Sequence, residues 1–170
     1  RLAEAPEGGL LLVPVSGGDG SGELQRARLL ARSARLRWQG MPVAIAAASS
    51  ALGSVSDRGV DYLPLPASPT RCTAEVAALI AARRPALVLF DSTARPGQLA
   101  AARAAGAGVV YLSSRPSARR RGFRPGAFTR IDEHWSVEFD PDRRLPGPLQ
   151  KLALRLRPGL QWRALGTLHE

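Results

Sequence analysis

The chain has 170 residues, of which 45% are hydrophobic, and a formal net charge of +10. This length suits one domain with a sizeable core, and the hydrophobic fraction excludes a disordered chain. No apolar run reaches the roughly 18 residues of a membrane-spanning helix, and the single cysteine, Cys72, excludes a disulfide within the chain. We expect a cytoplasmic protein, because a reducing compartment needs no disulfides.

The positive charge does not by itself indicate nucleic-acid binding. Of 24 basic residues only Lys151 is lysine, and the abundance of arginine and alanine is typical of a GC-rich, bacterial-type genome. Aromatic residues make up 5% of the chain, and none is interleaved with the basic residues of the first predicted helix. Because base-stacking surfaces need aromatic side chains, we expect no nucleic-acid partner.

Apolar runs predict six strands, taken here in chain order. The first is continuously apolar, as in a strand buried on both faces of a parallel sheet. The last alternates between apolar and polar residues. The predicted strands are Gly9–Val15, Met41–Ala47, Gly59–Leu65, Pro85–Asp91, Gly108–Ser114 and Asp132–Phe139.

Helical patterns separate these runs. Glu23–Arg37 has one alanine- and leucine-rich face and one arginine-rich face. Thr73–Arg83 and Pro96–Ala105 are predicted helices, and "PLQKLALRLRP" in the tail predicts one more short helix. Strands that alternate with helices predict an α/β, Rossmann-like three-layer domain with a mostly parallel sheet. Ligands of such folds bind beyond the carboxyl ends of the strands.

A glycine-rich turn follows the first strand, with four glycines between Gly17 and Gly22. It is not a dinucleotide fingerprint, because Glu23 occupies the third glycine position and no carboxylate follows the second strand before Asp57. It is not a P-loop either, because no Gly-Lys-Ser/Thr follows. Two interpretations remain: a flexible turn, or a turn whose backbone N–H groups face an anionic ligand at the helix start.

The segment "GDGSGELQRARLLARSARLRWQGMPVAIAAAS" resembles the first βαβ unit of GT-B glycosyltransferases. The peptidoglycan-type N-acetylglucosaminyltransferases and related nucleotide-sugar hydrolases share a turn of the form G-x-G-H-x-x-R. Here Gly20, Gly22 and Arg26 match that turn, and "RRPALVLFDS", "AGAGVVYLSS" and "IDEHWSV" are similar to later segments of the same domain. The likeness covers about 130 residues. Glu23 stands where the family commonly has histidine, which contacts substrate or acts as base.

The resemblance implies the acceptor-binding, amino-terminal half of a two-domain enzyme. Residues 1–170 would form one domain, and residues 141–170 would lead into a second half that binds the nucleotide-sugar donor. We therefore expect this chain alone to be inactive. The implied partners are that missing half and a sugar or lipid-linked acceptor. We expect neither a metal nor a resident cofactor.

The sequence contains two candidate catalytic residues and a set of candidate binding residues. Glu23 is either a base or a carboxylate that favours the helix dipole. Asp91 ends the fourth strand, where it either accepts a proton or sugar hydroxyl or caps its own loop. The candidate substrate-binding residues lie in the glycine turn, the first helix and the basic segment after the fifth strand: Gly18, Gly20, Ser21, Gly22, Arg26, Ser113, Arg115, Arg119, Arg120 and Arg121.

The basic segment "SSRPSARRRGFRP" has three interpretations. Its arginines suit the phosphate of an acceptor, because guanidinium groups bind phosphates bidentately. With Phe123 and Phe128 they suit a peripheral contact with an anionic membrane. The third interpretation is a solvated loop. His134, on the sixth strand, is expected to be structural. Besides the acceptor-binding half, the alternatives are a non-catalytic acceptor-recruiting subunit of a split glycosyltransferase and a small domain that binds an anionic metabolite.

Overall fold

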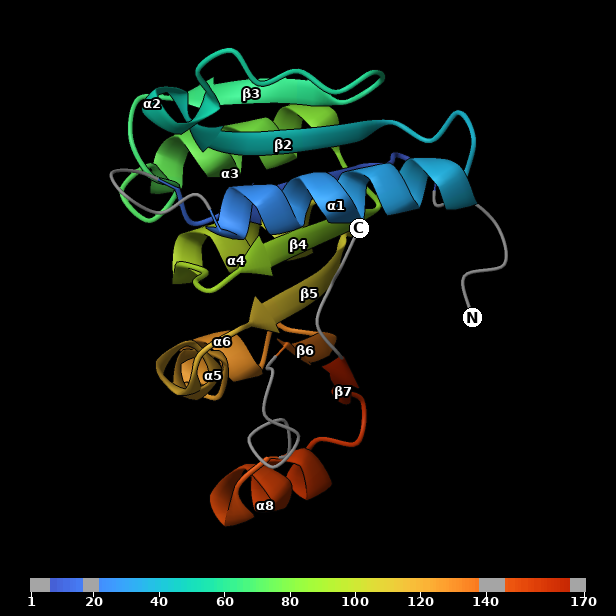
Figure 1. The fold of residues 1–170 in the computed structure, drawn as a ribbon. Helices are drawn as coiled ribbons and strands as arrows, with labels where there is room; N and C mark the ends of the chain where they lie inside the picture. The colour runs from blue at the N-terminus through green and yellow to red at the C-terminus, as the bar shows by residue number, and fades with distance from the viewer. Residues whose placement is uncertain (1–6, 17–21, 138–145, 166–170) are drawn as a thin grey trace.

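The computed structural model describes residues 7–16, 22–137 and 146–165. Seven parallel strands form one sheet in the order β3-β2-β1-β4-β5-β6-β7 (Figure 1). This confirms the predicted α/β class and the parallel sheet. The strands are β1 Leu10–Pro14, β2 Val43–Ala48, β3 Asp61–Leu65, β4 Leu87–Asp91, β5 Gly108–Ser113, β6 Glu133–Val137 and β7 Gln161–Leu165.

Helices cover both faces of the sheet, as expected for three layers. In Figure 1, α1 lies in front of the sheet, and α3 and α4 lie behind it. The helices are α1 Gly22–Arg37, α2 Ser49–Leu52, α3 Thr73–Arg83, α4 Pro96–Ala104, α5 Pro116–Gly122, α6 Pro125–Phe128 and α8 Pro148–Leu156.

Two hydrophobic clusters, one on each face, form the core. On one face the small residues Ala27 and Ala31 of α1 pack on Leu12 and Ile45, so the helix approaches β1 and β2 closely. On the other face α3 and α4 pack together on the strands, with Ile80 and other aliphatic side chains fully buried. Burial of a side chain of this size contributes about 1.5–3 kcal/mol to folding.

Four elements differ from the sequence prediction. The segment after β5, predicted to be a loop, forms the helices α5 and α6, each with a proline in its first turn. A seventh strand, β7, pairs in parallel with β6 at the edge of the sheet. Its largely exposed residues give it no apolar run that could have predicted it. The short helix α2 was not predicted either.

The arginine face of α1 stabilises the fold through Asp57, which precedes β3. Arg28 donates two hydrogen bonds to the Asp57 carboxylate, at 2.7 and 3.1 Å, and Arg32 and Tyr62 also donate to it. These hydrogen bonds hold the pKa of Asp57 well below its usual range. Part of the arginine content is therefore used within the fold rather than for a partner.

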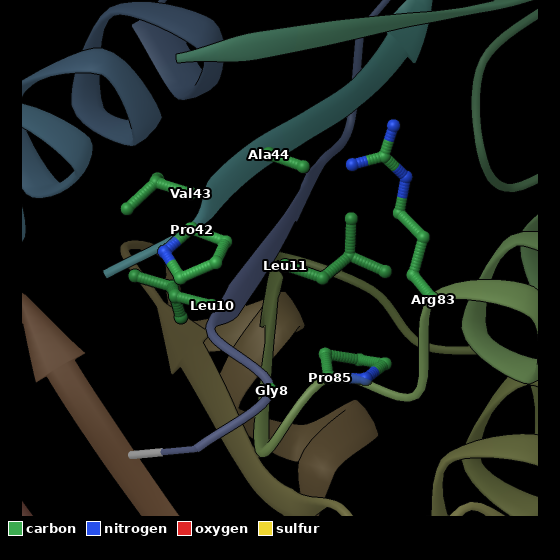
Figure 2. Close-up of a pocket in the computed structure, with 8 residues that line it drawn as sticks. All are labelled: Gly8, Leu10, Leu11, Pro42, Val43, Ala44, Arg83 and Pro85. Atoms are coloured by element: carbon green, nitrogen blue, oxygen red, sulfur yellow. The ribbon is translucent and has the colours of Figure 1, made fainter. Parts of the chain in front are cut away.

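The amino-terminal edge of the sheet holds a small cavity of about 260 Å³ (Figure 2). Its lining is glycine, proline and aliphatic side chains, apart from Arg83. Arg83 is paired with Asp61, at 2.8 Å. Gly9 is needed here, because its φ is +78° and a Cβ would lie 2.3 Å from the Pro42 carbonyl oxygen. This edge offers little to a polar ligand.

Candidate functional site

The order in which strands are added to the sheet reverses at β1: β2 and β3 lie on one side of it, and β4 and the later strands lie on the other. The neighbouring strands β1 and β4 pair in register, with Pro14 opposite Asp91. The helix that follows β1 covers one face, and the helix that follows β4 covers the other. The connections therefore diverge at the carboxyl ends of these strands, which is where ligands bind in open α/β sheets.

An open cavity of about 530 Å³ lies at this point. Four arginines line it, and we call it the arginine cavity: Arg95, Arg115, Arg121 and Arg124. Hydroxyl groups of Thr70, Ser92, Thr93 and Ser117 contribute further hydrogen-bonding groups. Among the described residues, Glu23 is its one acidic lining residue.

The cationic side chains of the cavity are poorly neutralised by the described part of the chain. Arg115 approaches the Glu23 carboxylate at 3.9 Å. Arg95 donates to the carbonyl of Thr70 at 3.0 Å, and Arg121 donates to that of Ser92 at 3.2 Å. The guanidinium of Arg124 has no hydrogen bond or ion pair with a described residue. Four arginines and one carboxylate thus line the cavity in the described part of the chain, and this excess of positive charge favours an anion.

Arg26 and Asp91 form a partly buried ion pair at the same edge of the sheet. Nε of Arg26 donates to Oδ2 of Asp91 at 2.7 Å, and its Nη2 donates to Oδ1 at 3.0 Å and to the Ser114 hydroxyl at 3.3 Å. The Asp91 side chain is 2% exposed and that of Arg26 is 16% exposed. Burial raises the pKa of Asp91 above its usual value, against the lowering effect of Arg26. The pair fastens α1 to the end of β4.

Asp91 is therefore not placed as a base facing the cavity. It does not line the cavity, and both of its oxygens accept hydrogen bonds from Arg26. Ser92 also donates to Asp91, at 2.9 Å. The geometry assigns Asp91 and Arg26 the role of positioning α1, while Glu23, one turn before Arg26, reaches the cavity.

Ser92 adopts a backbone conformation that is uncommon for a residue with a side chain, with φ of 69°. Such a conformation costs on the order of 1–3 kcal/mol, and surrounding contacts must hold it. The N–H of Ser92 donates to the carbonyl of Leu112 at 2.8 Å, and its own carbonyl accepts from Tyr111 at 3.0 Å. Burial raises the pKa of Tyr111 to about 12, so its hydroxyl remains a donor. The β4 loop is thus rigidly held at the cavity wall.

The basic segment divides into residues that face the cavity and residues that do not. Arg115 and Arg121 line the cavity, whereas Arg120 is exposed and does not line it. Arg119 is buried, donates to the Ser136 hydroxyl at 3.0 Å and lies over the Trp162 ring. The interpretation as a solvated loop is therefore wrong for Arg119, because the segment is helical and turns this side chain inward.

Ser113 and His134 form a buried structural pair away from the cavity. The Ser113 hydroxyl lies 3.0 Å from Nε2 of His134, and Tyr111, Phe123 and Trp162 surround the imidazole. Burial, with a smaller contribution from Arg119, lowers the pKa of His134 to about 3. The neutral histidine fits the expected structural role, and Ser113 does not reach the cavity.

The structure describes only part of the glycine turn. Gly18, Gly20 and Ser21 lie outside the described residues. Gly22 begins α1, and a Cβ added there would meet nothing within 4 Å. The structure therefore gives no steric reason for glycine at this position.

Several residues that line the cavity were not among the candidate site residues. Arg124 belongs to the basic segment whose arginines were predicted to suit a phosphate, whereas Arg95, in the segment after β4, was not predicted. Each directly precedes a proline that starts a helix, as Arg115 does. An Arg-Pro pair after a strand was the one sequence signal that they share.

Neither metal ligands nor relatives identify the site further. In residues 7–16, 22–137 and 146–165, no three His, Cys, Asp or Glu side chains gather as a metal site. None of the helices in these ranges is long and apolar enough to cross a membrane. No family model, no curated protein and no solved structure matches the chain.

Proposed function

We propose that the arginine cavity binds a phosphate-bearing ligand. The observation that carries this proposal is that four arginines and, among the described residues, one carboxylate line the cavity at the switch point of the sheet. Guanidinium groups suit phosphate because their parallel N–H groups match two phosphate oxygens. An anion in this cavity would meet hydroxyl donors as well as cations, which suits a ligand with both phosphate and sugar-like groups.

We further propose that the chain is the acceptor-binding part of a glycosyltransferase of the GT-B type. The motif resemblance supports this, and so does the position of Glu23 on the cavity wall. Glu23 would accept the proton of the attacking acceptor hydroxyl, and the arginines would hold the acceptor's phosphate. The nucleotide-sugar donor would bind mainly to a second half, and contact with this chain would close the site.

Calorimetric titration at low salt tests phosphate binding. The ligands are inorganic pyrophosphate and a short-chain polyprenyl phosphate, and the variant is Arg124→Gln, which removes a cation without breaking a described contact. A charge-assisted hydrogen bond contributes about 1.5–3 kcal/mol, so affinity should fall on the order of tenfold or more. Arg37→Gln, at the far end of α1, is the matched control for the loss of one charge.

The outcomes separate the parts of the proposal. Absence of binding by the unaltered chain, or equal weakening by Arg37→Gln, contradicts a specific phosphate site. Equal affinity for pyrophosphate and the lipid phosphate favours an anionic-metabolite domain over an acceptor domain. Sugar transfer by the 170-residue chain alone, in a radiolabelled assay, contradicts the assignment as an incomplete half.

A further inference from the structure

Three leucines are exposed on one face of α8. Leu149 is 83% exposed, Leu152 54% and Leu156 78%. Their spacing of three and four residues aligns them along one side of the helix. Among the described residues only one other large hydrophobic side chain, Leu36 of α1, is as exposed. Exposed apolar groups that gather in this way mark an interaction surface rather than scattered surface residues.

The contacts that hold α8 leave this face outward. Leu154, on another side of the helix, packs against the hydrophobic core. Beyond the last turn, Nη1 of Arg157 donates to the carbonyl of Ile131 at 2.6 Å and also to that of Phe128. In Figure 1, α8 lies at the bottom of the molecule, beyond β7 and apart from the helices that cover the sheet. The helix is thus attached by one side and its end.

The charge on α8 is entirely positive. Lys151 and Arg155, one turn apart and both exposed, lie beside the leucines, and residues 146–165 contain no acidic residue. Two copies of this face would bring like charges together in a chain of net charge +10, which disfavours a dimer. The face also has no aromatic side chain, whereas the strong contacts of protein interfaces are enriched in Trp, Tyr and Arg and poor in Leu.

We propose that α8 docks on an anionic lipid bilayer. Leu149, Leu152 and Leu156 would enter the boundary between headgroups and acyl chains, and Lys151 and Arg155 would lie among the anionic headgroups. A short helix with an apolar face flanked by Lys and Arg is the pattern of helices that lie in the membrane interface. The three leucines offer little apolar area, so binding is weak, reversible and dependent on anionic lipid. This inference does not depend on the ligand of the arginine cavity.

Vesicle co-sedimentation at near-physiological salt tests the proposal. Vesicles of phosphatidylcholine with phosphatidylglycerol should bind the chain, and vesicles of phosphatidylcholine alone should bind it far less. The variant Leu149→Ser/Leu156→Ser should lower partitioning by tenfold or more, on the order expected for burial of two leucine side chains. Leu36→Ser, which removes an equally exposed leucine (84%) elsewhere, is the matched control. Lys151→Gln/Arg155→Gln should abolish the preference for anionic lipid.

Three outcomes would overturn the proposal. No binding to anionic vesicles does so directly. Equal binding by the double leucine variant means that net charge, or the arginine cavity, holds the lipid instead. Loss of a dimer in that variant, seen by light scattering without vesicles, means that a second copy covers the face.

Two controls accompany the assay. Excess pyrophosphate should leave vesicle binding intact, which separates failure of this proposal from failure of the phosphate site. Circular dichroism establishes that the variants, all at exposed positions, remain folded.

Discussion

Replacement of Arg26 with Met should destabilise the chain in a manner that acid reverses. The variant keeps the aliphatic part of the side chain but removes both hydrogen bonds to Asp91, whose side chain is 2% exposed. A buried carboxylate without its partner takes up a proton instead of remaining charged. For a carboxyl with an unfolded pKa of about 3.9, holding that proton at pH 7 costs about 4 kcal/mol, at about 1.4 kcal/mol for each pH unit. Removal of one partner of a buried pair typically costs 3–5 kcal/mol, which agrees.

The sign of the pH dependence follows from the raised pKa of Asp91. Between the unfolded pKa and the higher folded pKa, the native state binds more protons than the unfolded state, so stability falls as pH rises. Without Arg26 the folded pKa rises further and this window extends towards neutral pH. Acidification from pH 7 to pH 5 should therefore restore about 2.7 kcal/mol to the variant.

Urea denaturation followed by circular dichroism at several pH values measures both effects. The control is Asp91→Asn, which leaves a partly exposed arginine and should cost only about 1–2 kcal/mol, with no recovery in acid. In the double variant Arg26→Met/Asp91→Asn most of the loss at pH 7 should disappear. Two results would refute the conclusion that this pair holds α1 on β4. One is that Arg26→Met is as stable as the unaltered chain at pH 7. The other is that the variant loses as much stability at pH 5 as at pH 7.

Three further predictions test other positions. In Gly122→Ala the new Cβ would lie 2.6 Å from the His134 ring and 2.9 Å from that of Tyr111, so we expect a loss of about 1–3 kcal/mol in thermal denaturation; an unchanged melting temperature contradicts this packing. Burial lowers the pKa of His134 in the folded state to about 3, so the free energy of unfolding falls by roughly 1.4 kcal/mol for each pH unit below about 6.5. His134→Gln should remove this dependence on pH. An equal dependence in the variant would refute the assignment of the slope to His134. In an enzyme completed by the proposed second half, Glu23→Gln should lower the rate on the order of 100-fold with little change in melting temperature. Normal turnover would end the case for Glu23 as the base.

The sequence predicted the layers of the fold because its buried strands are long apolar runs. Leu11, Ile45 and Phe90 lie in such runs, and each is almost fully buried in the sheet. It did not predict β7, because Gln161 and Arg163 are exposed at the sheet edge. Pairing with β6, rather than an apolar run, makes this segment a strand. Nor did it predict α5, because its run of arginines follows no apolar period and Arg119 is buried through partners distant in sequence, Ser136 and Trp162.

The candidate site was predictable as an edge of the sheet but not as a set of side chains. Glu23 and Asp91 both lie at that edge, and sequence position gave them equal standing as catalytic candidates. Only the fold distinguishes their roles, because Arg26, three residues after Glu23, forms an ion pair with Asp91. Asp91 is thereby removed from the cavity wall, and Glu23 remains on it. Such a division depends on a contact between residues 65 positions apart, which no local pattern contains.

Three of the four cavity arginines are fixed by the residue that follows them. Arg95, Arg115 and Arg124 each precede the proline that starts α4, α5 or α6, and each has an extended backbone, with ψ of 147°, 150° and 142°. A proline disfavours the helical conformation in the residue before it and suits the first turn of a helix.

The same proline therefore starts a helix and holds the preceding arginine outside it, at the cavity. Arg84 and Arg157 also precede prolines, but neither of those prolines starts a helix, and neither arginine lines the cavity. With the backbone of three cations held in this way, less conformational entropy is lost when an anion binds. The local sequence thus preorganises the arginine cavity for the anion that we propose it binds, while the Arg26–Asp91 pair sets the position of Glu23 against it.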